Sequence, residues 1–137
     1  MLRRVAAVEA TKARFAGRPF QWGKVDCARV SLWHIRRLGH RTRNVGRAGP
    51  YDSALGARRA IARMGYANLA DALDGQGLRR VPGASAWAGD LIVVPGTDSF
   101  DAIGIWVGTG AALMFSEEAE GLVTLILNHP PEIAWRV

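Results

Sequence analysis

The sequence predicts an α+β fold in which amphipathic helices come first and a small antiparallel sheet follows. Up to Leu73, apolar residues recur at helical spacing between N-cap residues and glycines. After Gly75, short apolar runs alternate with separators that contain Gly, Pro or Asp, which is typical of antiparallel strands joined by tight turns. Because the helical segments precede the strands and do not alternate with them, the layout is α+β.

Four segments of the first half are predicted to be helical. The first is amphipathic and ends at Gly17, and the second has Asp26 as its N-cap and Gly39 as its stop. The fourth is capped by Asn68. The four segments are residues 2–16, residues 27–38, a segment entered through residues 51–53 and continuing to 64, and residues 69–73.

Four short apolar runs in the second half are predicted to be strands. The turns between them are expected at Pro95-Gly96, at residues 108–110 and at Glu120-Gly121, where separators of this kind allow the chain to reverse direction. We therefore expect the runs to form a small antiparallel meander. The runs are residues 91–94, 103–107, 111–115 and 122–127.

Length and hydropathy place the chain among single-domain proteins without a membrane segment. With 137 residues, 49% of them hydrophobic, the chain can bury one core, so we expect one domain over residues 1–137. No apolar run approaches the roughly 20 residues that cross a bilayer, and residues 1–17 lack the unbroken apolar centre of a signal peptide. We therefore expect no signal peptide, no transmembrane segment and no membrane insertion.

The net charge of +6 is unevenly distributed. Residues 1–63 hold 15 Lys and Arg against 3 Asp and Glu, whereas residues 64–137 hold 3 against 9. An Arg-rich segment at 36–47 is one pattern found in proteins that bind nucleic acid or another anionic polymer. However, no aromatic residue interrupts this segment to stack on bases, so we do not favour nucleic-acid binding.

The one cysteine, Cys27, stands at the first turn of the second predicted helix. A single cysteine excludes an internal disulfide. Unpaired backbone N–H groups and the helix dipole favour a thiolate at this position, and Lys24 and Arg29 would add to the effect, so we expect a lowered thiol pKa. The alternative is that Cys27 is a small buried apolar residue without chemistry.

Five motifs in a fixed order support the first interpretation. The motifs are Trp22-Gly23-Lys24-Val25-Asp26-Cys27, Gly89-Asp90-Leu91, the run at 103–108, Gly121-Leu122-Val123 and Ala134-Trp135-Arg136-Val137. With these motifs the chain resembles, over residues 19–137, the NlpC-type papain-like peptidases of the bacterial cell wall, and it looks most like small proteins encoded among phage and prophage tail genes.

The resemblance implies a role for several residues. Cys27 matches the family's nucleophile, Asp26 matches the polar residue before it, and Trp22 with Gly23 matches the loop that lines the cleft. Two positions depart from the family. Ala102 stands where the family has its histidine base, two residues before a glycine, and Met114 stands near the polar residue that orients that base. Since neither can move a proton, we expect catalysis to be impaired.

None of the three histidines is an obvious replacement. His34 lies two helical turns from Cys27, about 10 Å away, which is too far for a direct hydrogen bond. His40 follows the helix-ending Gly39 and is expected at the surface. His129, after the last predicted strand, is the weak candidate base that sequence alone leaves open.

No cofactor or metal site is predicted. The acidic residues after residue 95 lack the regular spacing of oxygen ligands for a cation, so we interpret them as solvated loops. These residues are Asp98, Asp101, Glu117, Glu118 and Glu120.

Three classes of function remain, and we favour the first because of Ala102 and Met114. The first is a structural or assembly protein of a phage or prophage tail, whose NlpC-like fold contacts other tail or tail-tip proteins. Such a protein would lie in the bacterial cytoplasm before assembly and in the virion tail afterwards. The second is an active cysteine peptidase or amidase that cleaves peptidoglycan during phage entry, and the third is a module that binds nucleic acid or another anionic polymer.

Overall fold

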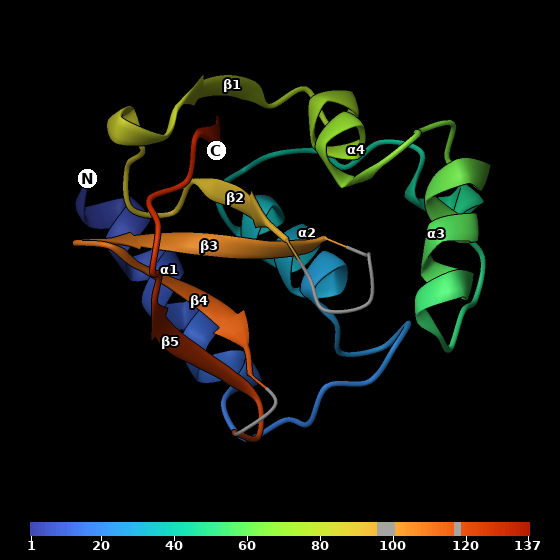
Figure 1. Ribbon diagram of the computed structural model, residues 1–137, viewed down its shortest axis with the longest axis horizontal. Helices are drawn as coiled ribbons and strands as arrows, with labels where there is room; N and C mark the ends of the chain where they lie inside the picture. Colours follow the sequence, from blue (N-terminus) through green and yellow to red (C-terminus); the bar gives the residue numbers. More distant parts are fainter. Residues whose placement is uncertain (96–100, 117–118) are drawn as a thin grey trace.

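The computed structural model describes residues 1–95, 101–116 and 119–137, and it has the predicted order of helices before strands (Figure 1). Helices lie along one side of a curved sheet, and α3 stands apart from the sheet at the edge of the molecule. No described helix combines the length and the apolar character needed to cross a membrane. The helices are α1 (Leu2–Phe15), α2 (Cys27–Arg37), α3 (Ala54–Arg63) and α4 (Leu69–Gly75), with 3-10 turns η1 (Val45–Arg47) and η2 (Gly83–Ser85).

The helices begin at the residues that the sequence marks as caps. The side chain of Asp26 accepts a hydrogen bond from the backbone N–H of Arg29, and Ser53 and Asn68 do the same at the starts of α3 and α4. Each cap satisfies one N–H that has no partner within its helix. The predicted helices are therefore confirmed, and only α4 runs two residues further than expected.

All described strands join one antiparallel sheet with the order β1-β6-β2-β3-β4-β5. The predicted meander is β2 to β5. Two strands were not predicted: β1, and β6, which pairs with both β1 and β2 in the sheet. The strands are β1 (Arg79–Pro82), β2 (Leu91–Val94), β3 (Ala102–Gly108), β4 (Ala111–Phe115), β5 (Leu122–Ile126) and β6 (Ile133–Arg136).

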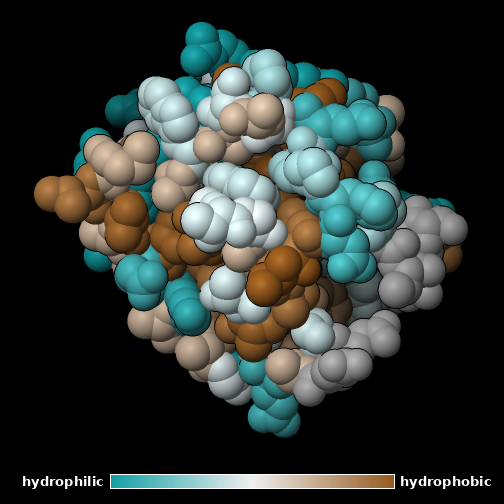
Figure 2. Space-filling view, turned by 60° about the vertical axis from the view of Figure 1, so that its left-hand side comes forward, coloured by the Kyte–Doolittle hydropathy of each residue, from teal (hydrophilic) through white to brown (hydrophobic). Residues whose placement is uncertain are grey.

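The two faces of the sheet carry two different apolar clusters. On the helix side, Leu91 and Ile105 pack with residues of α1 and α2 such as Val8 and Val30. On the opposite face a smaller cluster of buried residues is built from alternate positions of the same strands. At the molecular surface, the face turned forward in Figure 2 has hydrophobic residues gathered near its centre. Because side chains of a strand alternate between faces, neighbouring residues serve different clusters.

Asp90 ties the first helix to the last strand. Its carboxylate is fully buried and accepts hydrogen bonds from the guanidinium groups of Arg4 and Arg136 and from the backbone N–H groups of Trp87 and Val137. A buried carboxylate is stable only when such donors replace its water. Asp90, which directly precedes β2, thus joins the start and the end of the chain.

Candidate functional site

The loop before α2 is held by a close contact between two segments of backbone. Gln21 and Val25 form an isolated antiparallel bridge, and Gly23 between them has a φ of +78°. A Cβ atom at Gly23 would lie 2.1 Å from the carbonyl oxygen of Tyr51, so no other residue fits there without moving the chain. The glycine therefore fixes the loop against the segment that leads into α3.

Asp26 is the centre of the polar contacts beside this loop. It is 1% exposed, and its Oδ2 accepts hydrogen bonds from the backbone N–H of Gly23 at 2.8 Å and from the Tyr51 hydroxyl at 2.5 Å, while its Oδ1 accepts the N-cap bond from Arg29. Burial and the bond to Asp26 raise the pKa of Tyr51, so its hydroxyl remains a donor. The structure thus brings Asp26, Gly23 and Cys27 together as the motif predicts, with Asp26 holding the loop in place.

The Cys27 thiol differs from the sequence-based expectation. The residue as a whole is partly exposed, but its thiol is buried, and this burial raises the thiol pKa to about 11 in spite of a hydrogen bond with the backbone of Ile103. The predicted lowering of the pKa is wrong because desolvation outweighs the helix dipole. The two expected cations do not compensate: Lys24 is exposed, and the Arg29 guanidinium lies over the Tyr51 ring.

The positions of the family's two missing polar residues lie on β3 and β4. Ile103, which contacts the thiol, is the residue next to Ala102, whereas Ala102 itself packs in the cluster on the opposite face. Met114 is buried in that same cluster, and its side chain lies over Gly104. Ala102 and Met114 therefore share an apolar environment, and neither is among the groups that act on the thiol pKa.

The structure brings no imidazole to Cys27. His34 is fully buried and hydrogen-bonded to Thr11 and to the carbonyl of Gly89, and His40 is half-buried after the end of α2. His129 is exposed beyond β5, where Leu127 pairs with Gly110 at the far end of β3 from Ile103. Gly108 lies five positions along the strand from Ile103, about 16 Å away, so the weak candidate His129 is remote from the thiol.

An aromatic wall stands beside the Cys27 loop. Phe20 packs edge-to-face on Trp22 with the ring centres 4.8 Å apart, and on Phe115 at the end of β4 with the centres 5.3 Å apart. Phe20 is 41% exposed, and Trp22 and Phe115 are partly exposed. We call these three residues the aromatic wall. Through Phe20 and Phe115, the wall connects Trp22 in the loop before α2 to the end of β4.

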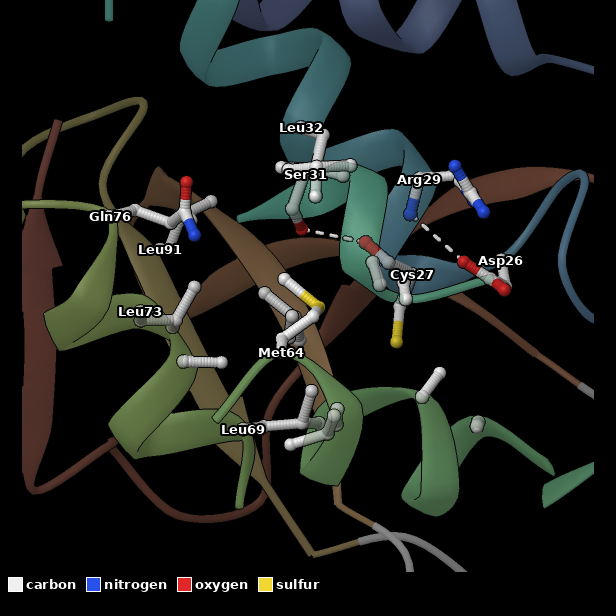
Figure 3. Close-up of a pocket in the computed structure, with 18 of the residues that line it drawn as sticks. Asp26, Cys27, Arg29, Ser31, Leu32, Met64, Leu69, Leu73, Gln76 and Leu91 are labelled. Atoms are coloured by element: carbon white, nitrogen blue, oxygen red, sulfur yellow. Dashed lines mark hydrogen bonds between the residues drawn. The ribbon is translucent and has the colours of Figure 1, made fainter. Parts of the chain in front are cut away.

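A cavity opens beside Cys27, between α2, α3 and α4, and Trp22 of the aromatic wall is one of its lining residues (Figure 3). The space free of atoms in this cavity and at its mouth is about 770 Å³, which includes space open to solvent. Figure 3 shows the Cys27 sulfur directed from the start of α2 toward α3, with Leu69 and Leu73 of α4 further along the cavity. The lining is dominated by aliphatic side chains, among them Leu32, Ala57, Ala60, Ile61, Met64 and Leu91.

This cavity was not predicted. The signal for half of it is present in the sequence, since Ala57, Ala60, Ile61 and Met64 recur at the spacing of one helical face. Such a stripe predicts that one face of α3 packs against other apolar side chains, but it does not predict a cavity between them. The cavity is apparent only from the positions of α2 and α4 relative to α3.

The acidic residues after residue 95 add no metal site within the described part of the chain. Asp101 and Glu120 are exposed, and the described residues contain no group of three or more His, Cys, Asp or Glu side chains placed to hold a metal ion. Asp98, Glu117 and Glu118 lie outside the described residues.

Comparisons with known proteins support the fold. A family model described as a domain of unknown function, DUF6950, matches residues 3–137. Among solved structures, the chain is similar to RipD from Mycobacterium tuberculosis, described as a non-catalytic NlpC/p60 domain protein adapted to peptidoglycan binding. The TM-score is 0.50 with 16% identity, over 98% of this chain and 97% of that one.

A second similar structure is that of the peptidoglycan hydrolase RipB from the same organism. The TM-score is 0.52 with 19% identity, over 98% of this chain and 65% of RipB, so the chain spans less than two thirds of the length of RipB. No curated protein matches the chain. The predicted NlpC-like α+β fold is thus confirmed, and because the two neighbours are described as non-catalytic and as a hydrolase, the fold does not decide activity.

Proposed function

The chain belongs to the DUF6950 family and has an NlpC/p60-like fold, and from this premise we propose that it is a non-catalytic binding domain for peptidoglycan. The proposed binding surface is the aromatic wall beside Cys27. The finer proposal, carried by the resemblance to proteins encoded among phage tail genes, is that the domain acts in a phage or prophage tail.

One observation carries the non-catalytic assignment, namely the state of the Cys27 thiol. The groups that act on it are its own burial, the backbone of Ile103 and the neighbouring charge of Asp26, and no imidazole is among them. A cysteine nucleophile needs a nearby base to form the thiolate and an acid to protonate the leaving amine. With a thiol pKa of about 11, very little thiolate exists at neutral pH.

The aromatic wall supports binding in place of cleavage. The rings of Phe20, Trp22 and Phe115 pack on one another without being buried, so they form a firm apolar surface at the edge of the site. Aromatic rings offer large contact areas at small entropic cost, which suits recognition of sugar rings and peptide side chains. The description of RipD as adapted to peptidoglycan binding is consistent with such a use of this fold.

A sedimentation assay with insoluble peptidoglycan tests the binding. The wild-type chain should cosediment, and Phe20→Ala and Trp22→Ala should each reduce the bound fraction. Leu55→Ala is the matched control, because Leu55 is an exposed apolar residue of α3 outside the wall. If the wild-type chain stays in the supernatant, or if the wall variants bind as well as the control, the proposed function is wrong.

A release assay tests the non-catalytic part separately. Soluble fragments set free from peptidoglycan should be the same for the wild type and for Cys27→Ser. Fragment release that depends on Cys27 would overturn this part of the proposal and favour a hydrolase.

Labelling of purified phage particles with an antibody against the chain tests the tail assignment. The assignment fails if the particles lack the protein.

A further inference from the structure

The cavity between α2, α3 and α4 has a chemistry that peptidoglycan does not explain. Its lining is mainly aliphatic, from α2, α3 and α4 and from the strand residues Leu91 and Ile103. Several polar lining side chains are already engaged: Asp26 accepts from Tyr51, Ser31 donates to the carbonyl of Cys27, and Gln76 exchanges two hydrogen bonds with the backbone of Arg43. Away from Arg29, sugars and peptide backbone would therefore enter the cavity with few hydrogen-bond partners, at a considerable free-energy cost.

One arginine lines the same cavity, and two others lie near its lining residue Ala48. Arg29 is a lining residue, Arg63 donates to the carbonyl of lining residue Ala48, and Arg47 is exposed directly beside Ala48. Residues 27–70 contain nine arginines and one acidic residue, Asp52. We call Arg29, Arg47 and Arg63 the arginine rim.

None of the rim arginines forms a salt bridge with a described acidic side chain, although Asp26, which is 1% exposed, lines the same cavity next to Arg29. The salt bridges between described residues use Arg4, Arg80 and Arg136 and none of the rim arginines. On α4, Asp74 pairs with Arg80 at 2.7 Å, and Asp71 also faces Arg80, at 3.9 Å. The rim is thus a cationic edge around an apolar interior.

We propose that this cavity binds a single aliphatic chain with an anionic head group, a carboxylate or a phosphate. The chain lies among the aliphatic side chains beside Cys27, where it needs no hydrogen bonds, and the head group meets the arginine rim. Arginine forks bind both kinds of anion through paired N–H groups, and an apolar pocket with a few charged groups at one end fixes the orientation of such a ligand. This inference does not depend on binding of peptidoglycan by the aromatic wall.

Calorimetric titration of the whole chain with short amphiphiles tests the proposal, below the concentrations at which they form micelles. Octanoate or octyl phosphate should bind saturably with one site per chain. Comparison of the two titrations identifies which head group is preferred. In the carboxylate series from hexanoate to decanoate, affinity should rise roughly three- to fourfold per added CH₂ until the cavity is full. Octyltrimethylammonium, with the same chain and the opposite charge, should bind at least about tenfold more weakly than the preferred anion.

Two variants locate the site. Ala60→Leu places extra atoms in the cavity and should abolish binding, with thermal unfolding used to show that the variant is folded. Arg47→Gln should weaken binding by roughly three- to tenfold. Lys12→Gln, which removes an exposed charge from α1, should leave the affinity unchanged. Because Arg47 is a surface residue, its result is informative even if Ala60→Leu does not fold.

The proposal is overturned if neither anion binds saturably, if the cationic amphiphile binds as tightly, or if folded Ala60→Leu binds like the wild type. Equal affinities of Arg47→Gln and Lys12→Gln for the anion would likewise show that the arginine rim does not bind the head group. The sedimentation assay with Phe20→Ala reports on the aromatic wall alone, so either proposal can fail without the other.

Discussion

The hydroxyl of Tyr51 donates a 2.5 Å hydrogen bond to the buried carboxylate of Asp26, which joins the segment before α3 to the start of α2. The bond connects residues 25 positions apart, and it helps to hold the Cys27 loop next to the cavity. Removal of either side-chain group would break this hydrogen bond, so the contact can be tested by substitution of either residue.

Removal of this hydroxyl should destabilise the protein measurably. Tyr51→Phe leaves the Asp26 carboxylate with its two backbone donors and removes a bond to a charged group, which typically costs about 1.5–3 kcal/mol. Urea denaturation followed by tryptophan fluorescence measures the change. Tyr66→Phe is the matched control, because the hydroxyl of Tyr66 accepts an exposed bond from Asn44 and its loss should cost less than about 1 kcal/mol.

Alkylation of Cys27 should be slow in the folded protein. With a thiol pKa of about 11, roughly one thiol in a thousand is ionised at pH 8, whereas an ordinary thiol is substantially ionised there. We expect iodoacetamide to react about a hundredfold more slowly with the native chain than with the chain in denaturant, as followed by mass spectrometry. Comparable rates in the two states would mean that the thiol is accessible and activated.

Restoring the family's histidine alone should not activate the thiol. In Ala102→His the new side chain points to the sheet face opposite Ile103, the residue that contacts Cys27. The alkylation rate of native Ala102→His should therefore stay within about twofold of the wild-type rate at each pH. A large acceleration that titrates near neutral pH would show that the imidazole reaches the sulfur.

Stability should fall as the pH drops below about 6.5. Burial lowers the pKa of His34 from its ordinary value of 6.5, with Arg4 also lowering it and Asp90 raising it. In this range the unfolded chain binds a proton that the folded chain excludes, so the free energy of unfolding decreases with decreasing pH. The stability is fully present above the unfolded-state pKa and is lost progressively as the pH falls toward the lowered value.

Urea denaturation of His34 variants between pH 7.5 and 5.5 measures this effect. His34→Gln should reduce the pH dependence, whereas exposed His129→Gln should keep it. Since the pKa of His40 is also lowered, by partial burial and by Arg4 and Arg3, His40→Gln separates the contribution of His40 from that of His34. An unchanged slope in His34→Gln would show that another group is responsible.

Loss of the Asp90 carboxylate should be the most damaging of these changes. Asp90→Ala leaves the guanidinium groups of Arg4 and Arg136 without their buried partner, and breaking such a pair typically costs about 3–5 kcal/mol. Thermal unfolding and urea denaturation measure the loss. Asp71→Ala removes an exposed carboxylate 3.9 Å from Arg80 and should cost less than about 1 kcal/mol.

The parts of the fold that local patterns determine were predictable. Asp26, Ser53 and Asn68 cap their helices as expected, and β2 and β4 have the predicted bounds. The strands β1 and β6 were missed for physical reasons. For β1, Pro82 argues against a strand over 79–82. For β6, the four residues that follow the proline-rich turn are too few to show a periodic pattern. Their pairing joins segments more than 50 residues apart, which no local pattern reports.

The candidate site was predictable only in part. The loop, its glycine and its acidic cap lie beside Cys27 as the motif indicates, but the sign of the thiol pKa shift does not follow from the helix start. The shift depends on burial by residues distant in sequence, including Ile103. The same holds for the cavity, which exists because α3 and α4 stand away from α2.

The contact between Gly23 and the carbonyl of Tyr51 has a consequence for recognition by Trp22. Since the backbone of Gly23 is in direct contact with the backbone of Tyr51, the loop that carries the indole is fixed before a ligand binds. The entropy of arranging this loop is lost during folding and not during association, so a ligand that stacks on Trp22 should bind with little conformational adjustment.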